Sequence, residues 1–220
     1  MALLCATPAA VLAAEDVPCP GAVAWAAAHP QESDAALAAR DAARGYTNPR
    51  LRAELAGRVA RDQGARNALL ADSRDRTLHR ALWEVDGDNL RWLQALLATQ
   101  NFPNAAQVGE QGMYDIWVLA HHADRAPEFQ AALLPMLELR TDQGELAAGA
   151  LARFTDRVLK GQGKPQRYGT QFSPREWARA HFGLPDAQSL QVVEANRREL
   201  GLMPLADYVC MMSEARKARP

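Results

Sequence analysis

Apolar residues recur every three or four positions along almost the whole chain, a spacing that places them on one face of an α-helix. The clearest stripes are Leu51, Leu55 and Val59; Leu90, Leu93 and Leu97; and Leu151, Phe154 and Val158. At 220 residues the chain is long enough to bury a substantial core in one domain. The sequence therefore predicts an all-α fold: a single-domain helical bundle with one irregular, extended loop around residues 161–172, where glycine and proline gather.

Capping residues predict where the first helices begin and end. Ser33 is a typical N-cap for a helix that ends at Gly45, and Asn48-Pro49 places a cap and an N1 proline before the next helix. We expect that helix to reach about residue 71 and a further helical stretch over 72–84. Asp86-Gly-Asp88 is interpreted as a turn and a cap before the Leu90 stripe.

The later boundaries follow from the same signals. Residues 101–104 (Asn-Phe-Pro-Asn) break the chain, and Asn104 with Gln107 forms a capping box. Residues 116–120 are apolar on every side, which indicates a central, surrounded helix. Pro127 starts an antiparallel partner, and further helices are expected to end at Gly161 and Gly201. A second capping box, Ser173-Pro-x-Glu176, and a short tail over 204–218 complete the prediction.

The N-terminus has the pattern of an export signal. Residues 2–14 carry no charge and end in small residues before Glu15-Asp16, which is typical of the apolar region and cleavage site of a secretory signal. A basic first region is missing, so we expect the true start to lie upstream. The alternative is a small helix packed on the domain. The predicted organisation is a truncated signal segment (1–14), a helical extension (15–47) and the all-α domain (48–218), exported to the periplasm or medium.

Cysteine positions leave two readings open. Cys5 would leave with the signal, so Cys19 and Cys210 would remain near the two ends of the chain. In an oxidising compartment they can join, which stabilises the fold by roughly 4–5 kcal/mol on a chain-entropy model. The other reading is two unpaired, buried thiols.

The charge balance excludes some partners. A formal net charge of −1 argues against a general electrostatic attraction to nucleic acid or anionic lipid. The apolar N-terminal segment is too short to span a bilayer. The partner that remains is a small polar or peptide-like ligand, and no cofactor or metal is predicted.

Polar residues continue two of the apolar stripes, which is where a buried site would lie. The Leu51 stripe continues through Asp62 and Arg66, with Gln63 beside them. Ionisable groups that point inward cost several kcal/mol each unless they are paired. Asp62 and Arg66 are four residues apart, so they form either a structural ion pair or part of a ligand site.

The central helix ends in His121-His122-Ala-Asp124. Adjacent helical residues project about 100° apart, so the two histidines are poorly placed to hold one metal ion. His122 as a general acid or base is better motivated, because an imidazole with a pKa of about 6.5 suits proton transfer. Interaction with the helix dipole is the alternative role.

A second polar group follows the helix that carries Asp156-Arg157. The irregular loop supplies donors and acceptors of hydrogen bonds from four side chains: Gln166, Tyr168, Thr170 and Gln171. This set has no nucleophile with a base in reach and no glycine-rich phosphate loop. It is better suited to holding a ligand than to hydrolysis by a Ser-His-Asp triad.

Taken together these strings resemble an uncharacterised, largely bacterial family known as domain of unknown function 6624. The resemblance rests on strings over residues 50–210: Asp62-Gln63-x-x-Arg66, Asp86-x-x-Asn89, Phe102-Pro103, Val108-Gly109, His122-Ala-Asp124, Asp156-Arg157, Gln166-x-Tyr168-Gly-Thr-Gln171, Asn196-Arg-Arg198-x-x-Gly201-Leu and Pro204-Leu-x-x-Tyr208. It implies a helical fold and a shared polar site, and no activity. Two positions depart from the pattern: Asn101 replaces a glycine and His121 replaces a glutamine, so a role for His122 is favoured over one for His121.

Two hypotheses follow. In the first, an exported enzyme with hydrolase-type acid/base chemistry uses His122, oriented by Asp124 or Asp156, on a small polar or peptide-like ligand. The ligand would be held by Asp62, Gln63, Arg66, Arg157, Gln166, Tyr168, Thr170 and Gln171. In the second, the same cluster is a structural network in a binding or interaction protein without chemistry. A solvent-reachable hollow beside the cluster would favour the first hypothesis.

Overall fold

The structure is a computed structural model that describes residues 18–99 and 101–217, and every regular element in these ranges is helical. The elements are α1 (Pro20–Ala28), η2 (Pro30–Glu32), α2 (Asp34–Arg44), α3 (Pro49–Ala71), α4 (Arg76–Thr99), α5 (Ala105–His121), α6 (Pro127–Asp142), α7 (Ala148–Gly161), α8 (Pro174–Trp177), η3 (Ala180–Gly183), α9 (Ala187–Glu199) and α10 (Leu205–Lys217). The all-α prediction is therefore confirmed, and the 161–172 segment is an irregular loop.

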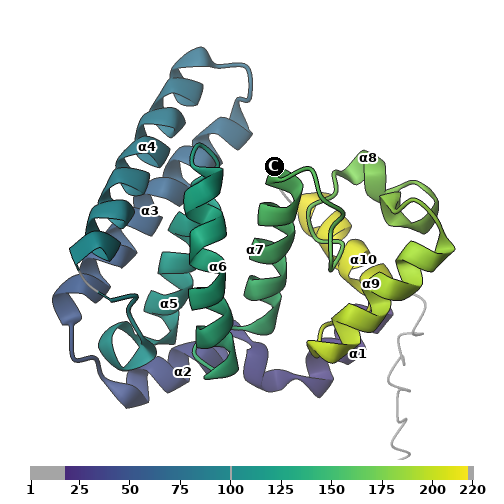
Figure 1. Cartoon of the computed structure of the whole chain (residues 1–220), viewed down its shortest axis with the longest axis horizontal. Helices are drawn as coiled ribbons and strands as arrows, with labels where there is room; N and C mark the ends of the chain where they lie inside the picture. The colour runs from purple at the N-terminus through teal and green to yellow at the C-terminus, as the bar shows by residue number, and fades with distance from the viewer. Residues whose placement is uncertain (1–17, 100, 218–220) are drawn as a thin grey trace, which may run out of the picture.

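Helices α2 to α7 form the larger of two packed groups, with α5 at its centre (Figure 1). Helix α5 packs against α2, α3, α4, α6 and α7. Residues 115–120 are all buried, and Ile116 and Ala120 have no exposed surface. The prediction of a central, surrounded helix is confirmed. The end of α5 places His121 and His122 at the edge of this core. Because α5 is held on every side, the core fixes the position of both histidines.

The predicted helix starts are confirmed by the capping bonds. Asn48 accepts a hydrogen bond from the backbone amide of Leu51, with Pro49 at the first helical position. Asn104 and Ser173 each form the complete capping box with Gln107 and Glu176. These bonds satisfy amides at helix N-termini that have no partner within the helix.

The interpretation of Asp86-Gly-Asp88 as a turn is wrong, because α4 continues without a break from Arg76 to Thr99. Both carboxylates instead reach helix α3: Asp86 accepts from Arg66 and Asp88 from Arg58. Gly87 is buried, and a Cβ there would lie 3.0 Å from Nη1 of Arg125. The glycine is thus explained by packing and not by a turn.

Helix α5 contains a kink that the sequence did not predict. Gly109 has a φ of +76° inside the helix, and a Cβ there would lie 2.7 Å from Oδ2 of Asp41. Asp41, from α2, accepts hydrogen bonds from the amides of Glu110 (2.7 Å) and Gln111 (2.9 Å). A carboxylate from another helix therefore caps the segment of α5 that resumes after the kink.

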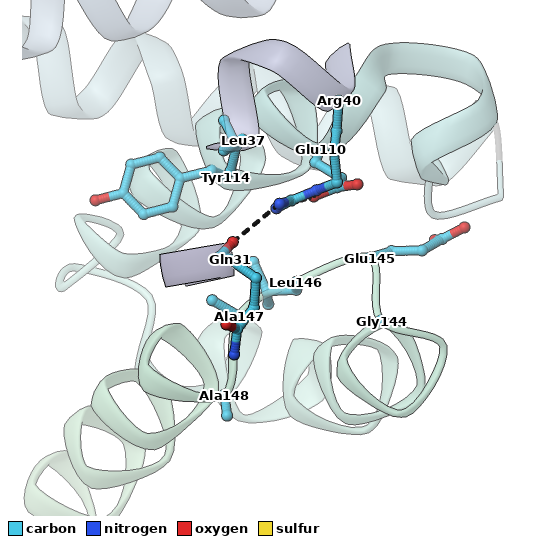
Figure 2. Close-up of a pocket in the computed structure, with 10 residues that line it drawn as sticks. All are labelled: Gln31, Leu37, Arg40, Glu110, Tyr114, Gly144, Glu145, Leu146, Ala147 and Ala148. Carbon is cyan, nitrogen blue, oxygen red and sulfur yellow. Dashed lines mark hydrogen bonds and ion pairs between the residues drawn. The ribbon is translucent and has the colours of Figure 1, made fainter. Parts of the chain in front are cut away.

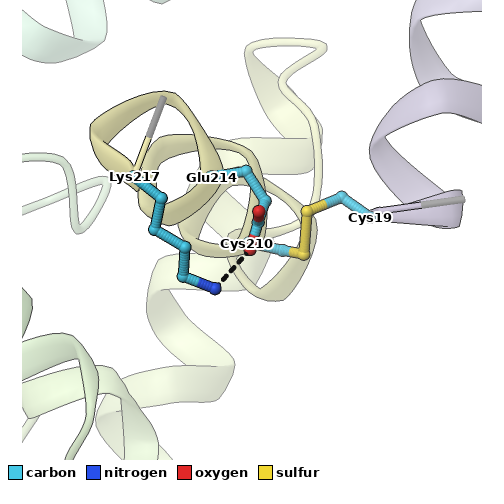
Figure 3. The surroundings of a disulfide bond; sticks show 4 residues. All are labelled: Cys19, Cys210, Glu214 and Lys217. Atoms are coloured by element: carbon cyan, nitrogen blue, oxygen red, sulfur yellow. Dashed lines mark hydrogen bonds and ion pairs between the residues drawn. A yellow bond between two sulfur atoms is a disulfide. The ribbon is translucent and has the colours of Figure 1, made fainter. Parts of the chain in front are cut away.

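A second, smaller core joins the two ends of the described chain. Helices α1, α9 and α10 contribute to it, together with α8 and η3. Cys19 and Cys210 form a disulfide between the start of α1 and helix α10, beside the Glu214–Lys217 ion pair (Figure 3). Of the two readings that the sequence left open, the structure shows the disulfide. The segment predicted as an export signal, residues 1–14, lies outside the described residues.

No helix in the described ranges is long and apolar enough to cross a membrane.

Candidate functional site

The centre of the candidate site is a pair between His122, at the end of α5, and Asp62, on α3. Nδ1 of His122 lies 3.0 Å from both carboxylate oxygens of Asp62. The Asp62 side chain is 1% exposed and that of His122 is 20% exposed. Among the described residues the ring of His122 makes hydrogen bonds only through Nδ1, and Nε2 is neither bonded nor buried. Nε2 therefore has access to solvent.

Arg66 connects this pair to a third helix. Its Nη2 donates to Asp86 of α4 at 2.5 Å and to Asp62 at 3.3 Å, and its Nε lies 3.2 Å from Asp62 and 3.0 Å from Nδ1 of His122. Nδ1 cannot accept from Arg66 and donate to Asp62 at once. An ionised carboxylate is the stronger acceptor, so we assign the Nδ1 proton to the bond with Asp62. That tautomer leaves Nε2 as an acceptor in the neutral imidazole.

The two carboxylates beside Arg66 have opposite pKa shifts. Burial alone would raise the pKa of Asp62, but hydrogen bonds and attraction from His122 and Arg66 outweigh it and hold that pKa below its usual value. The pKa of Asp86 is raised, chiefly by burial, although the charge of Arg66 opposes the rise. Asp62 is thus the fixed negative charge of the cluster, as the orientation of an imidazole requires.

His121 has a different environment from His122. Its ring stacks on Trp117 with 4.8 Å between centroids, and its buried Nδ1 has no partner in the described structure. Burial, together with the positive charges of Arg157, His122 and Arg153, lowers its pKa to about 2. His121 is therefore neutral at any physiological pH, which agrees with the preference for His122 as the acid or base.

A second polar group lies two residues beyond His122. Asp124 forms a two-bond ion pair with Arg157 of α7, in which Nε of Arg157 lies 2.7 Å from Oδ1 and Nη2 contacts Oδ2. Nη1 of Arg157 also donates to Oε1 of Gln171 at 3.2 Å. A hollow of about 320 Å³ opens at this pair, and its lining residues are Asp124, Pro127, Gln130, Arg157, Lys160 and Gly161.

The structure gives Asp156 a different role from the predicted one. The carboxylate is completely buried and accepts from the amides of Arg167 (2.7 Å), Tyr168 (3.0 Å) and Thr170 (2.8 Å). It also accepts from the hydroxyl of Thr170 at 2.8 Å. Each oxygen therefore has two donors, and Asp156 holds the irregular loop in place. His122 pairs with Asp62, and not with Asp124 or Asp156 as expected.

The remaining predicted ligand residues divide between the two polar groups and the loop. Gln63 donates to Asp62 at 2.8 Å, so it belongs to the His122 cluster. Gln166 accepts from the amide of Gln171 at 2.7 Å and closes the loop on itself. Tyr168 is only 6% exposed. Of the loop side chains, Gln171 alone reaches Arg157, so the loop contributes one residue to the site.

Three polar members of the site, Asp86, Gln130 and Lys160, were not among the predicted residues. Asp86 was noticed in the string Asp86-x-x-Asn89 but was interpreted as part of a turn. Gln130 of α6 donates to the backbone carbonyl of Ala120 at 3.1 Å and lines the hollow. The signal for Asp86 was its place one turn before the Leu90 stripe on a continuous helix. Nothing in the local sequence distinguishes Gln130.

Metal ligation is not what this arrangement suggests. In the parts of the chain that the structure describes, no three His, Cys, Asp or Glu side chains gather as potential metal ligands. Between Asp62 and Asp86, the positive charge is supplied by Arg66. The chemistry available to the cluster is therefore proton transfer at His122 and the binding of polar or charged groups at Arg66 and Arg157.

A larger hollow, of about 450 Å³, lies between the N-terminal elements and the α6–α7 connection (Figure 2). Arg40 crosses it, donating to the carbonyl of Gln31 at 2.9 Å and to Glu110 at 2.8 Å. The charges of Arg40 and Glu110 on its walls are thus paired with each other, and Glu145, also on its wall, pairs with Arg140. None of the residues predicted from the sequence lines it, so we place the candidate site at His122 and not here.

Comparison with known proteins gives one match. The model of a protein family described as "Family of unknown function (DUF6624)" matches residues 49–219. No curated protein matches the chain, and no solved structure matches it. The matched range contains α3 to α10 and hence every residue of the site.

Proposed function

The chain belongs to DUF6624, a family of unknown function, and from this premise we propose that it binds a small polar or peptide-like ligand beside His122 and uses that histidine as an acid/base. The observation that carries the proposal is the His122–Asp62 pair. A buried carboxylate, held ionised, fixes the tautomer of an imidazole whose second nitrogen is open to solvent. This is the arrangement by which a protein prepares a histidine to accept a proton.

The ligand is held by the neighbouring polar group. Arg157 lines the hollow at Asp124, together with Gln130 and Lys160. Their donors suit a carboxylate or carbonyl oxygen, whereas Asp124 suits an amino or amide group. A ligand with both kinds of group, such as an amino acid or a short peptide, would match this mixed lining.

The reaction that fits such a ligand is hydrolysis of an amide or ester. Nε2 of His122 would take a proton from a water molecule while the water oxygen bonds to the carbonyl carbon. The C–N or C–O bond then breaks, and the imidazolium returns the proton to the departing nitrogen or oxygen. Asp62 stabilises the imidazolium that forms between the two steps.

A second candidate is a structural network in a non-enzymatic binding protein. The observation that favours it is that α3 is joined to two neighbouring helices, by Arg66 to Asp86 of α4 and by Asp62 to His122 at the end of α5. Removing a partner from such a network leaves buried polar groups unsatisfied, at a cost of about 1–3 kcal/mol. The two candidates therefore predict different effects of one substitution.

The test replaces His122 with asparagine, whose amide can still donate to Asp62 but has no equivalent of Nε2. His79→Asn, at an exposed histidine of α4, is the matched control. Purified protein is assayed on a panel of chromogenic amino-acid amides, esters and dipeptides, and melting temperatures are measured with and without each compound.

We expect turnover by the parent and by His79→Asn, and its loss in His122→Asn with a melting temperature within about 3 °C of the parent. A compound that raises the melting temperature of the parent but is not turned over would indicate a binding protein and not an enzyme. The structural network is favoured if no compound acts on the parent and His122→Ala lowers its stability by more than about 1 kcal/mol.

We also propose that the protein is exported to the periplasm or the medium. The Cys19–Cys210 disulfide supports this, because disulfides persist in oxidising compartments. Fractionation of bacterial cells that express the full chain preceded by a short basic segment, compared with a chain that begins at Glu15, tests it. Equal retention of both in the cytoplasm would contradict export.

A further inference from the structure

A small hollow of about 150 Å³ lies among α1, α7, α9 and α10, in the second core of the molecule. Trp25, Met203 and Met211 supply apolar surface, and Arg153 and Arg197 also line it. The first half of α7 lines this hollow, whereas Arg157, which pairs with Asp124, lies toward the end of that helix. Thr170, one of the ligand residues predicted from the sequence, lines this hollow, whereas His122, Asp124, Gln130, Arg157 and Lys160 do not.

Arg197 brings a positive charge into this core without a carboxylate partner. The residue is 2% exposed, and its Nε and Nη1 donate to the backbone carbonyls of Met203 and Tyr168, each at 2.7 Å. No carboxylate in the described ranges forms an ion pair with it. Burial lowers the pKa of Arg197, against the attraction of Glu194, Tyr208 and Asp156. Both oxygens of Asp156 are taken by the loop, and Glu194 accepts from the amide of Leu205.

Arg153 is a second cation at the same hollow. Its guanidinium lies 4.8 Å from the centre of the Trp117 ring, and its buried Nε has no partner among the described residues. By contrast, three other partly buried arginines each form an ion pair with an aspartate: Arg52 with Asp115, Arg66 with Asp62, and Arg157 with Asp124. Buried charge is normally paired, because desolvation without a counter-charge is costly. Two arginines at one hollow therefore lack an anion.

We propose that this hollow binds a small organic carboxylate with a compact apolar body. A guanidinium matches the two oxygens of a carboxylate, which would supply the missing negative charge. The apolar residues Trp25, Met203 and Met211 would contact the rest of the ligand. An apolar cavity of about 150 Å³ is large enough for a molecule of the size of benzene, so the ligand carries one ring or a short branched chain.

The probes are benzoate, benzyl alcohol and inorganic phosphate, titrated into the oxidised full chain by calorimetry. Benzoate combines the charge with the apolar body, and each of the other two lacks one of these features. We expect a Kd of about 1 mM or lower for benzoate, a range open to a ligand of its size, and values at least tenfold higher for the other two. Equal affinity for phosphate or for benzyl alcohol, or no binding of benzoate, would overturn the proposal.

Two variants locate the binding. Arg153→Gln removes one unpaired cation and is expected to weaken benzoate binding about tenfold or more, whereas Arg198→Gln, at the exposed neighbour of Arg197, leaves it within twofold. Met211→Trp keeps both arginines and narrows the hollow, so it too should weaken benzoate binding. It provides the test if Arg153→Gln fails to fold. Unchanged affinity in folded Arg153→Gln, or in Met211→Trp when only that variant folds, would place benzoate elsewhere and sink the assignment.

Discussion

Among the described residues, two aspartates are completely buried, Asp62 on α3 and Asp156 on α7, and they differ in their partners. Asp62 accepts from His122 and Arg66, side chains that carry or can acquire a positive charge, and from the neutral amide of Gln63. Asp156 accepts from three backbone amides and one hydroxyl, all of them neutral. The side chains of Arg66 and His122 are 25% and 20% exposed, whereas Thr170 and Tyr168 around Asp156 are under 10% exposed.

The difference separates a carboxylate that supports chemistry from one that supports a fold. Backbone amides carry no charge, so the bonds to Asp156 serve to fix the path of residues 167–170. An imidazole can gain and lose a proton, so the bond from His122 to Asp62 fixes a reactive group in orientation while its other nitrogen stays accessible. Burial alone does not identify a functional carboxylate; the partners do.

The largest expected effect is at Asp156. Asp156→Ala would leave three amides and a hydroxyl without their acceptor in a closed environment, so we expect a loss of about 3–5 kcal/mol in the free energy of unfolding. Urea denaturation at pH 7 measures it. Asp142→Ala, an exposed aspartate at the end of α6, is the matched control and should stay within about 0.5 kcal/mol. A loss below about 1 kcal/mol at Asp156 would show that the loop holds its path without this carboxylate.

Asp62→Asn is expected to lower the free energy of unfolding by less, about 2 kcal/mol at pH 7, because water can reach His122 and Arg66 when they lose the carboxylate. The cost should also depend on pH. The folded pKa of Asp62 lies below its ordinary value of 3.8, so its contribution to stability is present above pH 3.8 and is lost as pH falls through the folded pKa.

Urea denaturation of the parent and of Asp62→Asn, compared at pH 7 and at pH 3, checks this sign. The difference between the two proteins should narrow at the lower pH. A difference that stays constant would mean that Asp62 acts through shape alone, and the comparison with Asp156 would lose its basis.

The last expected effect, similar in size to the one at Asp62, is a pH dependence of stability that arises from His121. Its folded pKa of about 2 lies far below the ordinary value of 6.5, so below pH 6.5 the unfolded chain binds a proton that the folded protein refuses. Stability from this group is therefore full above pH 6.5 and falls as pH is lowered. Between pH 6 and pH 4 the parent should lose about 2 kcal/mol more than His121→Phe, which keeps the stacking on Trp117. Equal slopes of stability against pH in the two proteins would show that His121 takes up a proton in the folded protein as it does in the unfolded chain.

Much of the fold could be predicted because its signals are local. The caps at Asn48, Asn104 and Ser173 need only the residues within one turn, and all three were found. The roles of Gly87 and Gly109 could not be predicted, because the neighbours that contact them are distant in sequence: Arg125, in the α5–α6 connection, and Asp41, on α2. From the sequence alone, a glycine that is required by a distant neighbour cannot be distinguished from a glycine in a turn.

The candidate site could be predicted in its members but not in its pairing. His122, Asp62 and Arg66 each continue an apolar stripe, which is a local property. The contact between His122 and Asp62 joins residues 60 positions apart, and no spacing rule reaches that far. Asp156 shows the converse limit: its partners are backbone amides, and every residue other than proline has one, so the sequence carries no mark of what this carboxylate binds.

The Cys19–Cys210 bond closes 191 positions of chain into a covalent ring. A single proteolytic cut inside that ring, for example in the exposed 161–164 segment, opens it without dividing the molecule. The nicked protein would migrate as two fragments only after reduction, and until then both pieces stay tethered at their far ends. Such a ring means that the first cut by a protease need not separate His122 from the loop that contributes Gln171 to its site.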